Sequence, residues 1–444
     1  MQRNITKLLI EWKNKRDRKP LIITGIRQCG KTYIIKEFGS QYYDDVAYFN
    51  FEGNIPLKSI FTQDFDTKRI LKELSSIILQ KPIIPKKTLI FFDEIQECPL
   101  ALTSLKYFCE NEPQLHIVCA GSLLGVAIKQ NNISFPVGKV EHLKMYPMSF
   151  SEFVCADDGA RYIEALTGYD FSKSLAELYT IPLEKHLKNY LIVGGMPEAV
   201  FNWVNNHDYN KIDKIQEDIL EDYANDFSKH APLVEIPKLG WLWDSIPKQL
   251  AKDNNKFVFS HVKSGKRAKD LENSLQWLVN AGLVYCPQMV SKPQIPLSFA
   301  ADASYFKVYM SDVGLLRKRS GLPYNIILEG NNLYDGFKGA LTENYVNNEL
   351  IINNFVSYFY RSDNTAEIDF IVEKDDLIIP IEVKSADNTR AKSLSGYIKK
   401  YQPKIAFKIS LKNTSTNKIE ETIIQSLPLY CCWNLPNVIS SLKI

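Results

Sequence analysis

The chain has 444 residues, of which 45% are hydrophobic and 24% are charged, and its formal net charge is +3. This composition is typical of a folded globular protein with two or three domains, and it excludes a disordered or low-complexity chain. The net charge is too small to indicate a nucleic-acid or membrane partner, so a nucleic-acid surface would have to be a local patch.

The first 150 residues alternate between helical and strand patterns. This alternation predicts a parallel sheet covered by helices on both faces. The first helix, Asn4–Arg16, has an apolar face made of Ile5, Leu8, Leu9 and Trp12. Strands are expected at Leu21–Thr24, Val46–Phe51, Thr88–Phe92 and Leu115–Ala120, and helices at Lys31–Phe38, Thr67–Leu79 and Pro99–Glu110.

The next 170 residues change character twice. Residues 151–234 are mostly helical, interrupted by Gly194–Pro197, and predict a helical lid with a connecting segment. Residues 235–322 have the order of a winged helix. In this interpretation the third helix is Arg267–Ala281, and a two-stranded wing comprises Leu283–Val290 and Tyr305–Met310.

Residues 323–444 predict a further α/β domain. We expect a long helix, a strand, a hairpin, a second helix and a last strand. These elements are Phe337–Phe355, Ser357–Arg361, the hairpin of Glu367–Glu373 with Leu377–Ser385, a helix near Ser393–Tyr401, and a strand near Lys404–Ile409.

The sequence indicates a cytoplasmic protein. No run approaches 18 apolar residues, so no membrane span is expected, and Met1–Lys15 lacks the apolar core of a signal peptide. The eight cysteines form no C-x-x-C pair, which indicates a reduced protein without a structural zinc site.

Residues 25–32 fit the pattern G-x-x-x-x-G-K-[ST], after an apolar strand and before a helix. In this motif main-chain N–H groups cradle phosphates, the lysine reaches the β- and γ-phosphates of ATP, and the threonine hydroxyl binds Mg²⁺. The loop consists of Gly25, Ile26, Arg27, Gln28, Cys29, Gly30, Lys31 and Thr32.

An apolar strand then ends in Asp93 and Glu94. We expect Asp93 to hold the magnesium and Glu94 to orient and deprotonate the attacking water. The alternatives are an accidental acidic pair beside a glycine-rich turn, and a site that binds ATP without hydrolysis. Ser122 ends the next buried strand, where it would contact the γ-phosphate or the water, or else cap a helix over Leu123–Lys129.

Through these motifs and the stretches named below, the chain resembles prokaryotic AAA-type ATPases with a C-terminal half of unknown function. The resemblance implies an additional strand between the P-loop strand and the acidic strand, and it implies no substrate. Where the family often has Gly-Arg, this chain has Gly138-Lys139, so a role at the γ-phosphate would fall to Lys139 or to another residue such as Arg161. The matching stretches are Thr24–Thr32, Phe91–Glu94, Ala120–Ser122, Tyr146–Phe153 and Gly194–Glu198.

A second group of charged residues follows near the C-terminus. Its spacing resembles the PD-(D/E)XK nuclease superfamily, with its restriction-endonuclease-like fold. Alternation along a hairpin would place three of the side chains on one face, where Mg²⁺ and an activated water could cleave a phosphodiester. The alternative is a solvated hairpin face. The residues are Glu343, Asp369, Glu382 and Lys384.

Four basic residues crowd the start of the third helix of the predicted winged helix. They would give a salt-dependent DNA contact, or they are a solvated helix start or a protein-docking module. These residues are Lys263, Lys266, Arg267 and Lys269.

Three hypotheses for function follow. The first is a Mg-ATP-dependent AAA-type ATPase coupled to a C-terminal DNA-binding, nuclease-like module. The second is a nucleotide-gated switch with slow turnover that binds a protein partner or forms a homo-oligomer. The third is a nuclease that ATP regulates.

Overall fold

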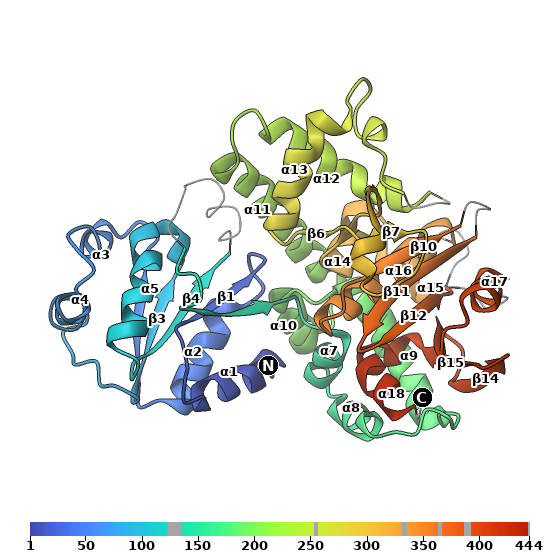
Figure 1. Ribbon diagram of the computed structural model, residues 1–444, viewed down its shortest axis with the longest axis horizontal. Helices are drawn as coiled ribbons and strands as arrows, with labels where there is room; N and C mark the ends of the chain where they lie inside the picture. The colour runs from blue at the N-terminus through green and yellow to red at the C-terminus, as the bar shows by residue number, and fades with distance from the viewer. Residues whose placement is uncertain (123–134, 253–255, 331–334, 363–365, 386–391, 443–444) are drawn as a thin grey trace. The chain divides into compact units, whose positions relative to one another are not determined.

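The computed structural model describes residues 1–122, 135–252, 256–330, 335–362, 366–385 and 392–442. The chain divides into two compact units, which Figure 1 shows in ribbon form. The first unit contains Met1–Tyr146 with Asn280–Gly282, and the second contains Pro147–Val279 with Leu283–Ile444. The finer boundaries expected at residues 150, 234 and 322 stay predictions.

The first unit is built on a parallel sheet of five strands, in the order β2-β3-β4-β1-β5. Strands β3 and β4 are buried at every position, because helices cover both faces of such a sheet. The additional strand that the resemblance implies is β4, which lies between β1 and β3. The strands are β1 (Leu21–Gly25), β2 (Asp45–Asn50), β3 (Thr88–Asp93), β4 (His116–Gly121) and β5 (Glu141–Met145).

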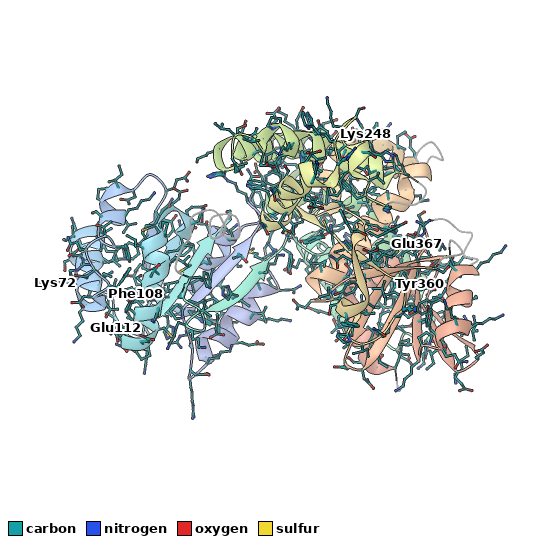
Figure 2. The ribbon with its side chains drawn as sticks, turned by 45° about the horizontal axis from the view of Figure 1, so that its top comes forward. Lys72, Phe108, Glu112, Lys248, Tyr360 and Glu367 are labelled. Carbon is teal, nitrogen blue, oxygen red and sulfur yellow. The ribbon has the colours of Figure 1, made fainter. Side chains whose placement is uncertain are left out.

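Apolar side chains of the helices complete the core of the first unit, and Figure 2 labels one of them, Phe108. The first helix buries Ile5, Leu9 and Trp12, but Leu8 is 43% exposed. The predicted apolar face is therefore too wide, since consecutive residues lie about 100° apart around a helix. The helical segments are α1 (Ile5–Asn14), α2 (Lys31–Tyr42), α3 (Ile55–Ser59), α4 (Thr67–Glu73), η1 (Leu74–Leu79), η2 (Ile95–Glu97) and α5 (Pro99–Asn111).

The second unit contains a mixed sheet of eight strands, in the order β14-β15-β13-β12-β11-β10-β7-β8. A separate pair, β6-β9, is antiparallel. The predicted hairpin is confirmed as β11 and β12. The strands are β6 (Val284–Tyr285), β7 (Gln288–Val290), β8 (Ala301–Phe306), β9 (Tyr309–Met310), β10 (Tyr358–Arg361), β11 (Glu367–Lys374), β12 (Leu377–Val383), β13 (Ile405–Ser410), β14 (Ser415–Ile419) and β15 (Thr422–Pro428).

The strands that we expected to form a separate wing belong largely to this sheet. Strand β7 pairs antiparallel with β8 and parallel with β10, so only β6 and β9 form a two-stranded pair of their own. The reason is burial, because Val290 and Leu297 join the apolar core of the sheet and are fully buried. The two predicted wing segments therefore do pair with each other, as β6 with β9 and β7 with β8, but β7 and β8 also belong to the eight-stranded sheet and do not form a two-stranded wing alone.

Helices surround the sheet of the second unit. The predicted helix at Arg267–Ala281 is confirmed as α13. The helical segments are α7 (Phe150–Ala156), α8 (Ala160–Thr167), α9 (Glu177–Val193), α10 (Pro197–Asn206), α11 (Tyr209–His230), α12 (Ile236–Leu250), η3 (Phe259–His261), α13 (Ala268–Asn280), η4 (Leu297–Ala300), α14 (Val313–Ser320), α15 (Tyr324–Glu329), α16 (Asp335–Ile352), α17 (Lys392–Tyr401), η6 (Leu429–Asn434) and α18 (Leu435–Ser441). Across the described ranges, none of the helices has the length and apolar character that crossing a membrane requires.

The helices expected to form a lid are joined to the C-terminal elements. The main-chain N–H of Phe150 donates to the Glu349 carboxylate on α16 at 2.8 Å. Leu175 exchanges two hydrogen bonds of 2.8 Å with the side chain of Asn413. The segment from α7 to α9 therefore packs as part of the second unit.

Two of the stretches that carry the family resemblance meet in the second unit. Met148 N donates to Gly195 O at 2.7 Å, and Gly195 N donates to the Asp312 carboxylate at 2.6 Å. A Cβ atom at Gly195 would lie 2.1 Å from Met148 O, so only glycine fits there. The stretches Tyr146–Phe153 and Gly194–Glu198 are therefore held together by main-chain hydrogen bonding.

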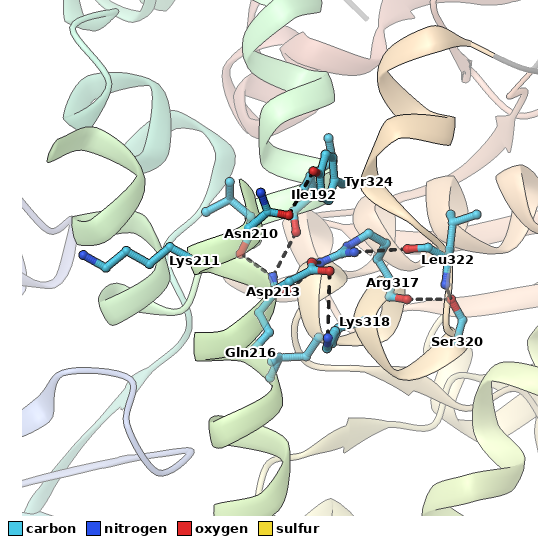
Figure 3. A network of polar contacts seen from close by, with 12 residues as sticks. Ile192, Asn210, Lys211, Asp213, Gln216, Arg317, Lys318, Ser320, Leu322 and Tyr324 are labelled. Atoms are coloured by element: carbon cyan, nitrogen blue, oxygen red, sulfur yellow. Dashed lines mark hydrogen bonds and ion pairs between the residues drawn. The ribbon is translucent and has the colours of Figure 1, made fainter. Parts of the chain in front are cut away.

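A buried arginine links three helices of this unit, as Figure 3 shows. Arg317 on α14 is 1% exposed, and its guanidinium donates to Asp213 and Gln216 on α11. Gln216 in turn donates to the carbonyls of Ile192 and Val193 at the end of α9, both at 2.9 Å. Because these groups are buried, the network fixes the helices against one another.

Candidate functional site

The phosphate-binding loop connects the end of β1 to the start of α2. Gly30 has φ +90°, and the non-glycine residue Gln28 has φ +62°. A Cβ atom at Gly25 would lie 2.2 Å from Met145 O, so the loop passes against the end of β5. Left-handed residues at a strand-to-helix turn orient successive N–H groups into an anion-binding concavity.

Lys31 is the first residue of α2 and is 6% exposed. Its ammonium donates to the carbonyls of Gly25 and Ile26, at 2.9 and 2.7 Å. The lysine is thus turned back onto its own loop. To reach a phosphate it would exchange these two carbonyls for phosphate oxygens, which are stronger acceptors because they are charged.

Thr32 and Asp93 lie together at the edge where β1 and β3 end. The Thr32 hydroxyl donates to Asp93 Oδ2 at 2.9 Å, and the Tyr48 hydroxyl donates to the same oxygen at 3.0 Å. Burial, followed by the charge of Asp93, raises the pKa of Tyr48 to about 12, so Tyr48 stays a donor at neutral pH. The hydroxyl and carboxylate oxygens fit Mg²⁺, which binds few protein oxygens beside a nucleotide.

Glu94 follows Asp93 in a left-handed conformation, with φ +51°. Such a conformation costs energy for a non-glycine residue and is common at functional sites. The amide of Gln96 donates to the Glu94 carboxylate, and Glu94 N donates to Asp93 Oδ1 at 3.1 Å. The turn therefore gives the two adjacent acids different partners.

Arg3 contributes to the loop and was missed by the sequence reasoning. Its guanidinium donates to Cys29 O at 3.2 Å and to Tyr146 O at 2.7 Å. Arg3 is 9% exposed and precedes α1. It thus ties the phosphate loop to the last residue of the first unit, a contact for which the sequence offers no local signal.

The four acidic and basic residues predicted near the C-terminus do converge. Val383 N donates to Asp369 Oδ2 at 2.7 Å, and the Lys384 ammonium lies 2.5 Å from Glu382 Oε1. Burial raises the pKa of Asp369 well above its usual range, and the charges of Glu343 and Glu382 raise it further. The hairpin and α16 therefore bring the predicted group together.

Three residues of this cluster were not predicted. Lys307 lies between β8 and β9 and is 1% exposed. Its ammonium is 2.7 Å from Glu367 Oε1 and 3.4 Å from Glu343 Oε2, and the Tyr309 hydroxyl donates to Glu343 at 2.7 Å. Figure 2 labels Glu367 on the sheet. We call Lys307, Tyr309, Glu343, Glu367, Asp369, Glu382 and Lys384 the acidic cluster.

Lysine ammonium groups contact three of the four carboxyl groups of the acidic cluster. Within the ranges that the structure covers, no group of three or more His, Cys, Asp or Glu side chains is placed to hold a metal. Lys384 pairs with Glu382, and Lys307 pairs with Glu343 and Glu367. These ammonium groups occupy oxygens of Glu343, Glu367 and Glu382 that a divalent ion would otherwise use, whereas Asp369 accepts from Val383 N.

The basic residues at the start of α13 gather beside an aromatic ring. Lys263, Arg267 and Lys269 are exposed, and Lys266 is partly buried. The ammonium groups of Lys263 and Lys266 lie 5.2 and 5.9 Å from the centroid of the Trp241 ring on α12. The patch thus combines positive charge with an aromatic side chain.

Sequence comparisons divide the chain into three stretches. Residues 17–154 match a family described as an AAA domain. Residues 184–325 and 338–432 match two domains of unknown function, DUF8612 and DUF4143. No curated protein matches the chain. The first match, together with the phosphate loop and the sheet, supports an AAA-type ATPase domain in the first unit, here called the AAA domain.

Solved structures with a similar course of the chain include three archaeal proteins. The Walker-type ATPase of Pyrococcus abyssi is 14% identical, with a TM-score of 0.44, and the match covers 72% of this chain and 95% of that chain. The ORC2 protein of Aeropyrum pernix, in its ADPNP-ADP complexes, is 11% identical, with a TM-score of 0.33, and the match covers 76% of this chain and 92% of that chain. The ORC1 protein of Aeropyrum pernix in complex with DNA is 14% identical, with a TM-score of 0.29, and the match covers 73% of this chain and 92% of that chain.

Ser122 in the AAA domain directly follows β4, where Gly121 pairs with Thr24 at the end of β1. It therefore lies at the edge of the sheet that carries the phosphate loop, and its contact with nucleotide stays a prediction. The helix at 123–129 that Ser122 would instead cap lies outside the described residues.

Lys139 is not placed to act on the γ-phosphate. It precedes β5, whose first residue Glu141 pairs with Leu21, the first residue of β1. The phosphate loop follows the other end of β1, and Lys139 forms an ion pair with Glu110 at 2.9 Å. The sheet register thus corrects this expectation. Arg161 lies on α8 over the ring of Tyr162, and its role as an arginine finger stays a prediction.

Proposed function

We propose that this protein binds Mg-ATP in the AAA domain and hydrolyses it. The observation that carries the proposal is the contact between Thr32 and Asp93, which joins the phosphate loop to the acidic strand end. Gly30 and Gln28 shape the loop for phosphates, and Lys31 stands at the start of a helix, where the dipole favours anions. These are the parts that P-loop hydrolysis requires.

The reaction would transfer the γ-phosphoryl group to water. Glu94 takes a proton from the water while the oxygen of that water attacks the γ-phosphorus. The bond between the γ-phosphorus and the oxygen that bridges it to the β-phosphate breaks, so ADP and phosphate leave. Mg²⁺, held by Thr32 and Asp93, would supply charge neutralisation for the phosphate oxygens. Ser122 would contact the γ-phosphate or the water from the end of β4.

Release of phosphate from ATP by the purified chain tests the proposal. Lys31→Ala should reduce kcat/KM by about 100-fold or more, because it removes the charge that Lys31 brings to the γ-phosphate. Lys72→Ala is the control, since Lys72 is an exposed lysine on another helix of the same unit, α4. Equal turnover in the Lys31 variant and the wild type would refute the assignment.

We further propose that the second unit contains a winged-helix part and a nuclease-like part. The winged helix is supported by α12, α13 and the β6-β9 pair within residues 235–322, and the nuclease-like fold by the convergence of Glu343, Asp369, Glu382 and Lys384. The patch at Lys263, Lys266, Arg267 and Lys269 is the candidate DNA surface. It lies at the amino end of a helix, and both the basic side chains and the helix dipole attract phosphate.

The DNA proposal is tested by measuring ATPase turnover with single- and double-stranded DNA at several salt concentrations. Stimulation that disappears when Lys263, Arg267 and Lys269 are changed to glutamine supports DNA as the partner. Indifference to DNA, with nucleotide-dependent assembly into oligomers, would instead support the nucleotide-gated protein switch.

A further inference from the structure

The acidic cluster contains more carboxyl groups than ammonium groups, and three of its four carboxyl groups contact an ammonium group. Four carboxyl groups, Glu343, Glu367, Asp369 and Glu382, face two ammonium groups, Lys307 and Lys384. The second oxygen of Glu382 is buried and has no hydrogen-bond partner. Burial of a carboxylate oxygen without a partner costs free energy of folding. The cations that lie near such oxygens therefore determine which ions the cluster can bind.

Lys307 is the most buried cation of the cluster. Its ammonium contacts Glu367 and Glu343, lies 5.0 Å from the centroid of the Phe359 ring, and acts on the charge of Asp369. Although burial alone lowers the pKa of Lys307, the charges of Glu343, Glu367 and Asp369 raise it well above its usual range. Two carboxylates within 3.4 Å favour the charged form of this buried lysine.

The position of Lys307 is fixed by the strands around it. Lys307 N donates to Pro287 O at 3.0 Å, and the residue stands between β8 and β9. Tyr309, two residues later, binds the same oxygen of Glu343 that Lys307 approaches. The lysine thus reaches the nuclease-like residues from a part of the chain that the nuclease pattern does not include.

We propose that Lys307 is the resident cation of the acidic cluster, and that it excludes a divalent metal ion from the predicted nuclease centre. The inference rests on the nuclease-like arrangement proposed above and is independent of ATP hydrolysis. A divalent ion and the Lys307 ammonium would compete for the oxygens of Glu343 and would repel each other in a buried site. The unaltered chain then cleaves no nucleic acid by a metal-dependent route.

Binding of Mn²⁺ alone, followed by the electron paramagnetic resonance of the free ion, tests this proposal. All proteins carry Asp93→Asn, which removes a metal ligand of the AAA domain. The parent should show no site that Asp369→Asn abolishes. Lys307→Met, which keeps the volume and removes the charge, should gain one site that binds Mn²⁺ at least about ten-fold more tightly than the parent protein binds Mn²⁺ anywhere. Asp369→Asn added to Lys307→Met should abolish that site.

Lys318→Met is the matched control, since Lys318 also belongs to an ion pair of the second unit, with Asp213 at 3.8 Å. It should bind no more Mn²⁺ than the parent. A parent site that Asp369→Asn removes would overturn the proposal and would strengthen the nuclease hypothesis. A folded Lys307→Met protein that binds no Mn²⁺ would overturn it too. Should Lys307→Met fail to fold, the parent titration decides alone.

Discussion

The carboxylates of the two candidate sites, one in each unit, have different hydrogen-bonding partners. In the AAA domain Asp93 accepts hydrogen bonds from two hydroxyls, those of Thr32 and Tyr48, and the nearby Lys31 is bound to main-chain carbonyls. In the second unit the carboxyls of Glu343, Glu367 and Glu382 meet ammonium groups. Neutral donors leave a carboxylate able to bind a metal ion, whereas buried ammonium groups satisfy it. The charge of the neighbours, more than the spacing of the acids, separates the two sites.

The largest expected effect concerns Glu94, whose carboxylate accepts a hydrogen bond from the amide of Gln96. Glu94→Gln should lower kcat for ATP hydrolysis by about 100-fold or more while ATP still binds, because only the proton acceptor is lost. Measurement of kcat and of nucleotide affinity checks this. Glu97→Gln, in the same turn but paired with Lys58, is the control. Unchanged kcat in Glu94→Gln would remove Glu94 from the chemistry.

A stability effect should follow from a buried acid of the second unit. Glu349 is fully buried, one of its oxygens lacks a partner, and burial raises its pKa to about 8. Because the folded state holds this proton more tightly, wild-type stability should fall as pH rises from the ordinary value of 4.5 to about 8.

Glu349→Gln should remove that pH dependence, since the amide oxygen can still accept from Phe150 N. At pH 8 the variant should be more stable than the wild type, by on the order of a few kcal/mol. Denaturant unfolding between pH 5 and pH 9 measures the difference. A wild type whose stability does not change over this range would contradict the raised pKa.

A smaller effect is expected at the arginine that supports the phosphate loop. Arg3→Gln should reduce kcat/KM for ATP by about ten-fold, because the carbonyl of Cys29 loses its donor and the loop loses its tie to Tyr146. Arg18→Gln is the control, since Arg18 also donates to a main-chain carbonyl, that of Lys13. Arg3→Lys should recover only part of the loss, as lysine lacks the fork that spans two carbonyls.

The smallest effect tests the neutral donors of Asp93. Tyr48→Phe should raise the Mg²⁺ concentration needed for half-maximal ATPase activity by about three-fold, because Asp93 loses one hydrogen-bond donor that orients it but keeps Thr32. A titration of activity with Mg²⁺ checks it. If the variant instead binds Mg²⁺ more tightly, the tyrosine competes with the ion rather than orienting its ligand.

Much of the first unit could be predicted because its signals are local. The strands β1, β3 and β4 are continuous apolar runs, and the phosphate loop is a contiguous motif. Strand β5 was missed because Glu141, His142 and Lys144 are polar, and His142 and Lys144 are exposed. Arg3 was missed since its partners are main-chain carbonyls, which any residue offers.

In the second unit the prediction succeeded for the hairpin and for the strands beside it, β10 and β13, but it missed β14 and β15 and the place of β7 and β8 in the same sheet. Asp369, Glu382 and Lys384 lie on adjacent strands with a short turn, so alternation sufficed to place them together. The parallel pairing of β7 with β10 joins segments that are far apart in the sequence, and no periodicity reveals it. Lys307 depends on that pairing, which is why the cation of the acidic cluster could not be foreseen.

The incorporation of β7 and β8 into the eight-stranded sheet has a practical consequence for dissecting the chain. A fragment that begins at the predicted boundary of residue 323 would expose the unpaired main-chain groups of β10, and such an open edge invites aggregation. It would also leave Glu343 and Glu367 without their counter-charge. Fragments intended to isolate the last domain should therefore begin before β6.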